Sequence, residues 1–154
     1  MSEYISITRT NYFHVKDPDS FCEFMDRVYG SSDSVSLWRR SDKEGKTVFA
    51  FGTCGAISGL KNAGIDDDDT VDESAYDEFI RGLQEHVAED DAVILLETGH
   101  EKLSYVTSTA TILTSNDYAH IDLAYMAVKK AAEMLGNPEW KTRCDGYKSL
   151  GKEC

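Results

Sequence analysis

Apolar and polar residues alternate along the first part of the chain. In residues 4–16 the apolar side chains at every second position are Ile5, Ile7, Phe13 and Val15. A period of two, in a segment rich in β-branched and aromatic residues, predicts a β-strand. Residues 35–40 and 46–53 have a similar composition and are separated by the polar turn SDKEG. These two segments therefore predict a β-hairpin.

Three other segments repeat their apolar residues every three or four positions, which is the spacing of one face of an α-helix. The first begins at Asp17, a favourable N-cap residue, followed by Pro18 at the first helical position, and we expect Gly30 to end it. The second covers residues 73–88, and the third begins near Asn116 and ends at the sequence LGNP. The three apolar stripes comprise Phe21, Phe24, Met25 and Val28; Tyr76, Phe79, Ile80, Leu83 and Val87; and Ile121, Ala124, Tyr125, Val128, Ala132 and Leu135.

Residues 92–96 and 103–115 predict two more strands, joined by the turn ETGHEK. The expected order of elements is βαββαββα. Its first six elements match the split β-α-β pattern of ferredoxin-like folds, so we expect an α+β sandwich with a mostly antiparallel sheet and helices on one face. A chain of 154 residues suits a single domain. We place that domain at residues 1–136 and expect a loosely packed tail over residues 137–154.

The formal net charge of −12 is concentrated in one segment. Residues 65–91 contain twelve acids and one base, Arg81, which gives this segment a net charge of −11. The other residues hold sixteen acids and fifteen bases and are nearly neutral. Such a local excess of acids indicates a negatively charged surface on one side of the molecule, whereas evenly spread acids would indicate only solubility. The twelve acids, which we predict to form a partner-binding surface, are Asp66, Asp67, Asp68, Asp69, Asp72, Glu73, Asp77, Glu78, Glu85, Glu89, Asp90 and Asp91.

The run of four aspartates near the start of this segment has several explanations. A calcium-binding EF-hand loop requires a glycine and a glutamate where the chain has Val71 and Asp77, so that pattern fails. Acids at a helix N-terminus interact favourably with the helix dipole, which accounts for Asp72, Glu73 and Asp77. The remaining run, residues 66–69, is explained either by a solvated spacer or by a surface for a basic partner.

A surface for a basic partner implies a particular class of target. Spread along a helix, these carboxylates approach the charge density of B-DNA, which carries one phosphate per about 1.7 Å of axis. We therefore predict a non-enzymatic module that binds a basic protein, with a nucleic-acid-binding enzyme as the leading target. The net negative charge disfavours direct binding of nucleic acid. No apolar run is long enough for a membrane span and no secretory signal is visible, so we expect a cytoplasmic protein.

An alternative hypothesis is a small enzyme or ligand-binding domain. Its candidate features are the glycine-rich segment 52–64 and the turn that places His100 between Glu97 and Glu101. The glycine spacing is neither GxGxxG nor that of a phosphate-binding loop, and the turn lacks the second histidine of a zinc-binding helix. A connecting loop and an ordinary polar turn explain both features more simply. We therefore assign no catalytic residue, no metal ligand and no cofactor.

Three short segments, RTNYFHVKD, GHEKLSYV and AAEMLGNP, resemble parts of small acidic uncharacterised proteins of bacterial mobile elements. Acidic anti-restriction and anti-CRISPR inhibitors also occur on such elements. The resemblance implies an inhibitor that acts by binding its target protein, and it transfers no functional residues to this chain.

Overall fold

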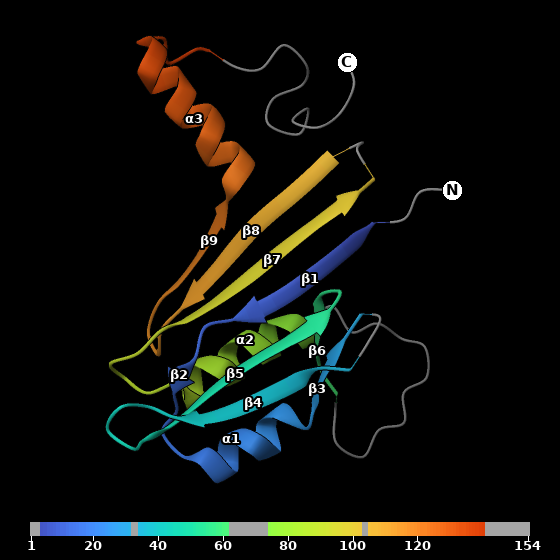
Figure 1. Cartoon of the computed structure of the whole chain (residues 1–154), viewed down its shortest axis with the longest axis vertical. Coiled ribbons are helices and arrows are strands. Elements are labelled where there is room, and N and C mark those ends of the chain that lie inside the picture. Colours follow the sequence, from blue (N-terminus) through green and yellow to red (C-terminus); the bar gives the residue numbers. More distant parts are fainter. Residues whose placement is uncertain (1–3, 32–33, 62–73, 103–104, 141–154) are drawn as a thin grey trace.

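The computed structural model describes residues 4–31, 34–61, 74–102 and 105–140, and within these ranges it shows an α+β protein (Figure 1). The strands are β1 (Ile5–Thr10), β2 (Phe13–His14), β3 (Val28–Gly30), β4 (Ser36–Ser41), β5 (Thr47–Cys54), β6 (Ile57–Leu60), β7 (Val93–Glu101), β8 (Tyr105–Leu113) and β9 (Tyr118–Asp122). The helices are α1 (Pro18–Met25), α2 (Ser74–His86) and α3 (Leu123–Leu135).

One large sheet organises the molecule, and all of its strand pairings are antiparallel. β5 pairs with β4 along one edge and with β1 and β2 along the other. From β1 the sheet continues through β7 and β8 to β9. A second, two-stranded antiparallel sheet joins β3 to β6. Three of the six pairings in the large sheet are therefore hairpins, and β1 lies at its centre between strands that are distant in sequence.

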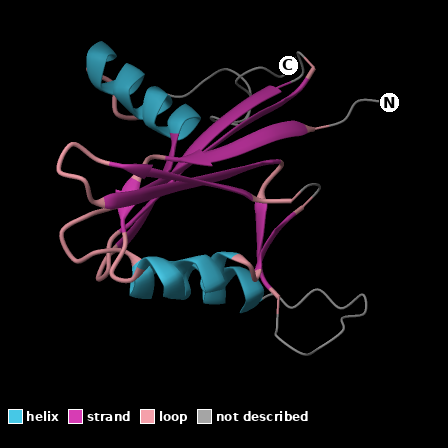
Figure 2. Ribbon diagram, turned by 60° about the horizontal axis from the view of Figure 1, so that its bottom comes forward, coloured by secondary structure: helices cyan, strands magenta, loops and turns pink. Residues whose placement is uncertain are grey.

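The hydrophobic core lies between the sheet and the helices α1 and α2, which cover the same face (Figure 2). The side chains with no exposed surface there include Phe13, Phe21, Phe49, Phe51, Phe79 and Leu83. α3 does not belong to this layer. It follows β9 directly and lies at the far end of the molecule from α1 and α2 (Figure 1). One face of the sheet is therefore covered by two helices rather than three.

Two predicted helix boundaries are wrong. The first helix ends at Met25 rather than near Gly30, because residues 28–30 form β3 and pair with β6. The third helix begins at Leu123 rather than near Asn116, because residues 118–122 form β9 and pair with β8. In both cases the spacing of apolar residues predicts a helix, but the residues form a short strand because they pair with another strand of the sheet. Among the described residues, no helix has the length and hydropathy needed to cross a bilayer.

Candidate functional site

The structure places six of the twelve predicted partner-binding acids and leaves six outside the described residues. Asp77, Glu78 and Glu85 lie on α2, and Glu89, Asp90 and Asp91 lie in the segment between α2 and β7. The six acids outside the described residues are Asp66, Asp67, Asp68, Asp69, Asp72 and Glu73.

The acids of α2 share an exposed surface with the acids of α1. α2 buries Phe79, Ile80 and Leu83 against the core, so its acids occupy the outer side. α1 buries Phe21 and Phe24 and likewise turns its acids outward. We call this surface the acidic helical layer; its members are Asp19 and Glu23 of α1, Asp26 at the C-cap of α1, Asp77, Glu78 and Glu85 of α2, and Glu89 and Asp90 after α2.

Close packing of α1 on α2 brings the two sets of acids together. The Phe24 ring of α1 stacks on the Phe79 ring of α2, with centroids 6.2 Å apart and an angle of 10° between the planes. Gly82 makes this approach possible, because a Cβ atom at that position would lie 2.3 Å from Cε1 of Phe24. The glycine in the middle of α2 is therefore a packing residue, although glycine is a poor helix former.

A groove of about 590 Å³ runs over the junction of the two helices. Its charged lining comprises Glu23, Arg27, Glu78, Arg81 and Glu85. The groove contains mixed charges, but the acids of the layer outnumber the two arginines. Such a shallow charged surface is suited to contact with another macromolecule rather than to enclosure of a small ligand, which usually binds in a largely apolar pocket.

Asp91 departs from the other acids, because its carboxylate is held by His14. The ring Nδ1 of His14 lies 2.9 Å from Oδ2 of Asp91, and the ring Nε2 lies 2.6 Å from Oδ2 of Asp42. The backbone N–H of His14 also donates to Asp91 at 2.7 Å. We call these three side chains the histidine bridge. It connects β2 to the β4–β5 turn and to the segment before β7.

Hydrogen bonding within the bridge shifts the pKa of each member towards its charged form. The bonds to Asp42 and then Asp91 raise the pKa of His14 above its ordinary value. The pKa of Asp42 is lowered by His14 and by the N–H groups of Lys46 and Glu44. Partial burial opposes ionisation of Asp91, but N–H groups of His14 and Ala92 outweigh it and lower its pKa. All three shifts favour the form of the bridge that has two carboxylates and one imidazolium.

The histidine bridge is suited to holding the fold rather than to catalysis. Both ring nitrogens of His14 already have carboxylate partners, so neither offers a free lone pair to a substrate or a metal. A cavity of about 790 Å³ lies beside it, lined largely by the β4–β5 turn. The described residues contain no group of three or more histidine, cysteine, aspartate or glutamate side chains arranged to hold a metal ion.

The residues of the alternative enzyme hypothesis do not converge. The predicted turn at ETGHEK is wrong, because residues 97–101 belong to β7 and pair with β8. Because side chains alternate along β7, Glu97 and His100 lie on opposite faces of the sheet. Of the glycine-rich segment, residues 52–54 end β5, a turn follows, and residues 57–60 form β6; residues 62–64 lie outside the described ranges. Gly59 allows close packing on α2, since a Cβ atom there would lie 2.6 Å from the carbonyl carbon of Ala75. Gly59 therefore has a packing role.

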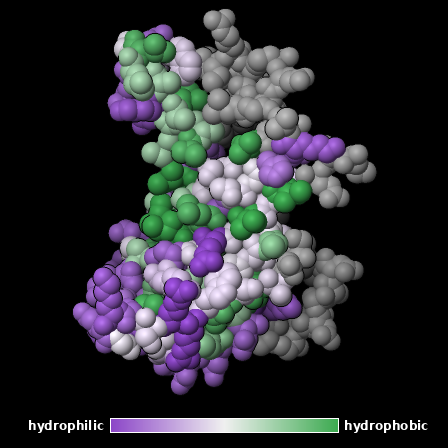
Figure 3. Space-filling view, viewed as in Figure 1, coloured by the Kyte–Doolittle hydropathy of each residue, from purple (hydrophilic) through white to green (hydrophobic). Residues whose placement is uncertain are grey.

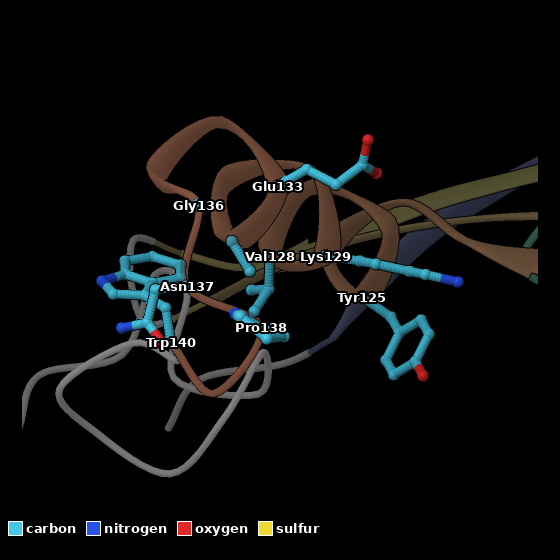
Figure 4. A pocket seen from close by; sticks show the side chains of 9 residues that line it. Tyr125, Val128, Lys129, Glu133, Gly136, Asn137, Pro138 and Trp140 are labelled. Carbon is cyan, nitrogen blue, oxygen red and sulfur yellow. The ribbon is translucent and has the colours of Figure 1, made fainter.

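A further cavity, of about 670 Å³, lies beside the C-terminal half of α3 (Figure 4). Its lining is largely apolar and includes Val128, Ala132, Pro138 and Trp140. The charged ends of Lys129 and Glu133 extend away from Trp140 (Figure 4). Among the described residues that line this cavity, no set of potentially catalytic groups therefore converges.

Two features of this region were not predicted from the sequence. Asp19, Glu23 and Asp26 were not assigned to the acidic surface, although their spacing of four and three along a helix with Phe21 and Phe24 inside was a usable signal. The histidine bridge has no local signal, because His14 is 28 residues from Asp42 and 77 from Asp91.

Comparison of the chain with family models, characterised proteins and solved structures finds no match, so the candidate site rests on its own geometry.

Proposed function

We propose that this protein is a non-enzymatic protein-binding module whose acidic helical layer docks onto a basic protein. The observation that carries this proposal is that two packed helices and the following turn carry eight carboxylates on their outer side. The described lining of the groove between the helices contains two arginines, Arg27 and Arg81. Like charges held this close repel one another and oppose folding. A basic partner relieves that repulsion when it binds. We also propose a partner-binding role for the six acids that precede α2 in the sequence, which lie outside the described residues.

The charge of the layer supports a nucleic-acid-binding enzyme as the target. α2 has 13 residues and is therefore about 20 Å long. A DNA duplex of that length carries about twelve phosphates. Eight carboxylates over a similar length are of the same order, so the layer can occupy a groove shaped for nucleic acid. We accordingly propose an inhibitor of the anti-restriction or anti-CRISPR type, acting in the cytoplasm.

We also propose that the centre of the fold is a ferredoxin-like unit. The pairings of β7 with β1, β1 with β5 and β5 with β4 support this proposal, as does the position of α1 and α2 on one face. In this interpretation β8, β9 and α3 extend the unit at one edge.

A DNA-displacement assay tests the proposed function. Purified restriction endonucleases and CRISPR effector complexes are loaded with a fluorescent DNA duplex, and the protein is added as competitor at 50 and at 300 mM NaCl. We expect the wild type to release the duplex from at least one enzyme, and less readily at the higher salt because the charges are screened. The variant Glu23→Gln/Glu78→Gln/Glu85→Gln should require at least about tenfold more protein, because it removes three charges from the layer.

The matched control is Glu44→Gln/Glu133→Gln/Glu139→Gln, which removes the same charge from exposed positions outside the layer. This control should compete as well as the wild type. Equal competition by both triple variants, or no displacement by the wild type from any enzyme, contradicts the proposal.

A further inference from the structure

The sheet face opposite α1 and α2 is covered by no helix and is mainly apolar. We call it the open face; its apolar members are Ile5 and Ile7 of β1, Trp38 of β4, Ile94 and Leu96 of β7, Val106, Ala110 and Ile112 of β8, and Ala119 and Ile121 of β9. The strand register aligns them in cross-strand rows, such as Leu96–Ala110–Ile121 and Ile94–Ile112–Ala119. Ile5, Ile7, Leu96 and Val106 are 52–63% exposed.

The charge of this face differs from that of the rest of the molecule. Acids make up 28 of the 154 residues. Even so, the outward positions of β1, β4, β5, β7, β8 and β9 carry no carboxylate, and their charged or titratable side chains are Arg9, Arg40, Cys54 and His100. A solvated sheet face normally carries polar side chains at its outward positions. Because the chain is so acidic, the absence of acids from this face indicates that a binding partner buries it in the functional assembly.

α3 extends this apolar surface beyond the sheet. Leu123, Tyr125 and Met126 in its first turn are 50–60% exposed, and Met134 and Leu135 near its end are more exposed still. Among its residues only Ala132 is buried. Figure 3 shows the hydrophobic side chains gathered across the middle of the molecule and onto the base of α3. An amphipathic helix normally buries its apolar stripe, so α3 lacks a packing partner for part of its surface.

We propose that the open face and the first turn of α3 form the interface of a homodimer, with a second copy of this chain as the occupant. The exposed apolar side chains of the open face present about 600 Å², which is at the upper limit for a monomeric protein. With Leu123, Tyr125 and Met126 the surface reaches about 900 Å², and a stable interface needs about 800 Å² from each partner. A twofold axis makes one such patch self-complementary.

The distribution of charge favours a second copy as the occupant. Two copies with a net charge of −12 each repel one another in most orientations. The acidic helical layer lies on the opposite side of the sheet from the open face. Contact through the open faces therefore keeps the two acidic helical layers far apart. A different, charged protein would find few charges of opposite sign on the open face, so a second copy is favoured as the occupant.

Sedimentation equilibrium or light scattering of the full chain tests the dimer. We expect a mass of twice 17.2 kDa at micromolar concentration for the wild type. Leu96→Lys should weaken the dimerisation constant at least tenfold, because it places a charge in the centre of the apolar interface. Met126→Lys, on α3, should also weaken it. Glu85→Gln changes the net charge by the same amount outside the interface and should leave it unchanged.

Circular dichroism and thermal unfolding establish that each variant is folded; both substituted side chains are at least half exposed, so folding should survive. A wild-type protein that remains monomeric up to about 100 μM overturns the proposal. If that monomer floats with phosphatidylcholine vesicles in a density gradient, the open face binds a lipid surface instead. Unchanged dimerisation in Leu96→Lys or in Met126→Lys also overturns it. Dimerisation should strengthen with NaCl, whereas DNA displacement should weaken, so the two proposals fail independently.

Discussion

His14 shows how one side chain can join three parts of the chain that are distant in sequence. It lies in a strand of two residues, which has little stability of its own. The ring bonds to Asp42 and Asp91, and Ala88 N–H donates to the His14 carbonyl at 3.0 Å. These contacts fix β2 between the β4–β5 turn and the end of α2. The side chain is 37% exposed, so solvent screens the bridge, and its effect should be visible mainly as a dependence on pH.

We expect the contribution of the histidine bridge to stability to fall on both sides of a pH window. The pKa of His14 is raised, so its contribution is full below the unfolded value of 6.5 and is lost as pH rises through the folded pKa. The pKa values of Asp42 and Asp91 are lowered, so their contribution is present above 3.8 and is lost as pH falls through their folded pKa values. Urea unfolding of the wild type and of His14→Asn should differ most between about pH 4 and 6.5. A difference that stays constant from pH 3 to 9 would contradict this prediction.

Residue identities alone could predict that acids concentrate in one segment, but not which of them are free to meet a partner. Asp90 and Asp91 are neighbours in sequence; Asp90 is exposed, whereas Asp91 is bonded to His14. Likewise, the alternation of Ile5 and Ile7 predicts a strand without indicating which face is inside. Thr8 and Thr10 are buried and the two isoleucines are exposed, because β1 is paired on both edges and only one face has helices.

At the scale of the elements, the contact between α1 and α2 depends on the absence of a side chain at Gly82. Phe24 is buried against Phe79 and His86, so its ring has little room to move. We expect Gly82→Ala to destabilise the protein by about 1–2 kcal/mol, because overpacking costs more than the helix propensity of alanine returns. Urea unfolding monitored by circular dichroism measures this change.

A double-mutant cycle provides the control. Phe24→Leu shortens the side chain that the new methyl group would strike, so Gly82→Ala should cost less in a Phe24→Leu background than in the wild type. Equal costs in the two backgrounds would show that the two residues are not coupled and would contradict the packing explanation.

Elements with strong local signals were predictable, and elements defined by distant partners were not. Asp17 and Pro18 correctly predict the start of α1, and the two segments around the turn SDKEG form the β4–β5 hairpin as expected. β3, β6 and β9 have three to five residues each and depend on pairing with β6, β3 and β8. Short strands of this kind have too few residues for a periodic pattern, so sequence spacing cannot distinguish them from helix ends or loops.

The whole molecule separates charge from apolar surface. α1 and α2 carry acids on one side of the sheet, and the open face on the other side carries none. A dimer built through the open faces would direct two acidic layers outward in opposite directions. Such a particle could engage two basic sites at once, and binding at the second site would then be strengthened by effective concentration rather than by new contacts.

The placement of the acids, and not only their number, should determine how salt affects stability. Salt screens the repulsion between exposed carboxylates that lie farther apart than the Debye length, which is about 10 Å at 0.1 M and about 3 Å at 1 M. We expect the wild-type melting temperature to rise by about 2–5 °C between 50 and 500 mM NaCl. The rise should be smaller in Glu23→Gln/Glu78→Gln/Glu85→Gln, which relieves the layer, than in Glu44→Gln/Glu133→Gln/Glu139→Gln, which removes the same charge elsewhere. Because both variants retain the open face, dimerisation affects them equally. Equal rises would show that total charge, rather than the acidic helical layer, sets the response.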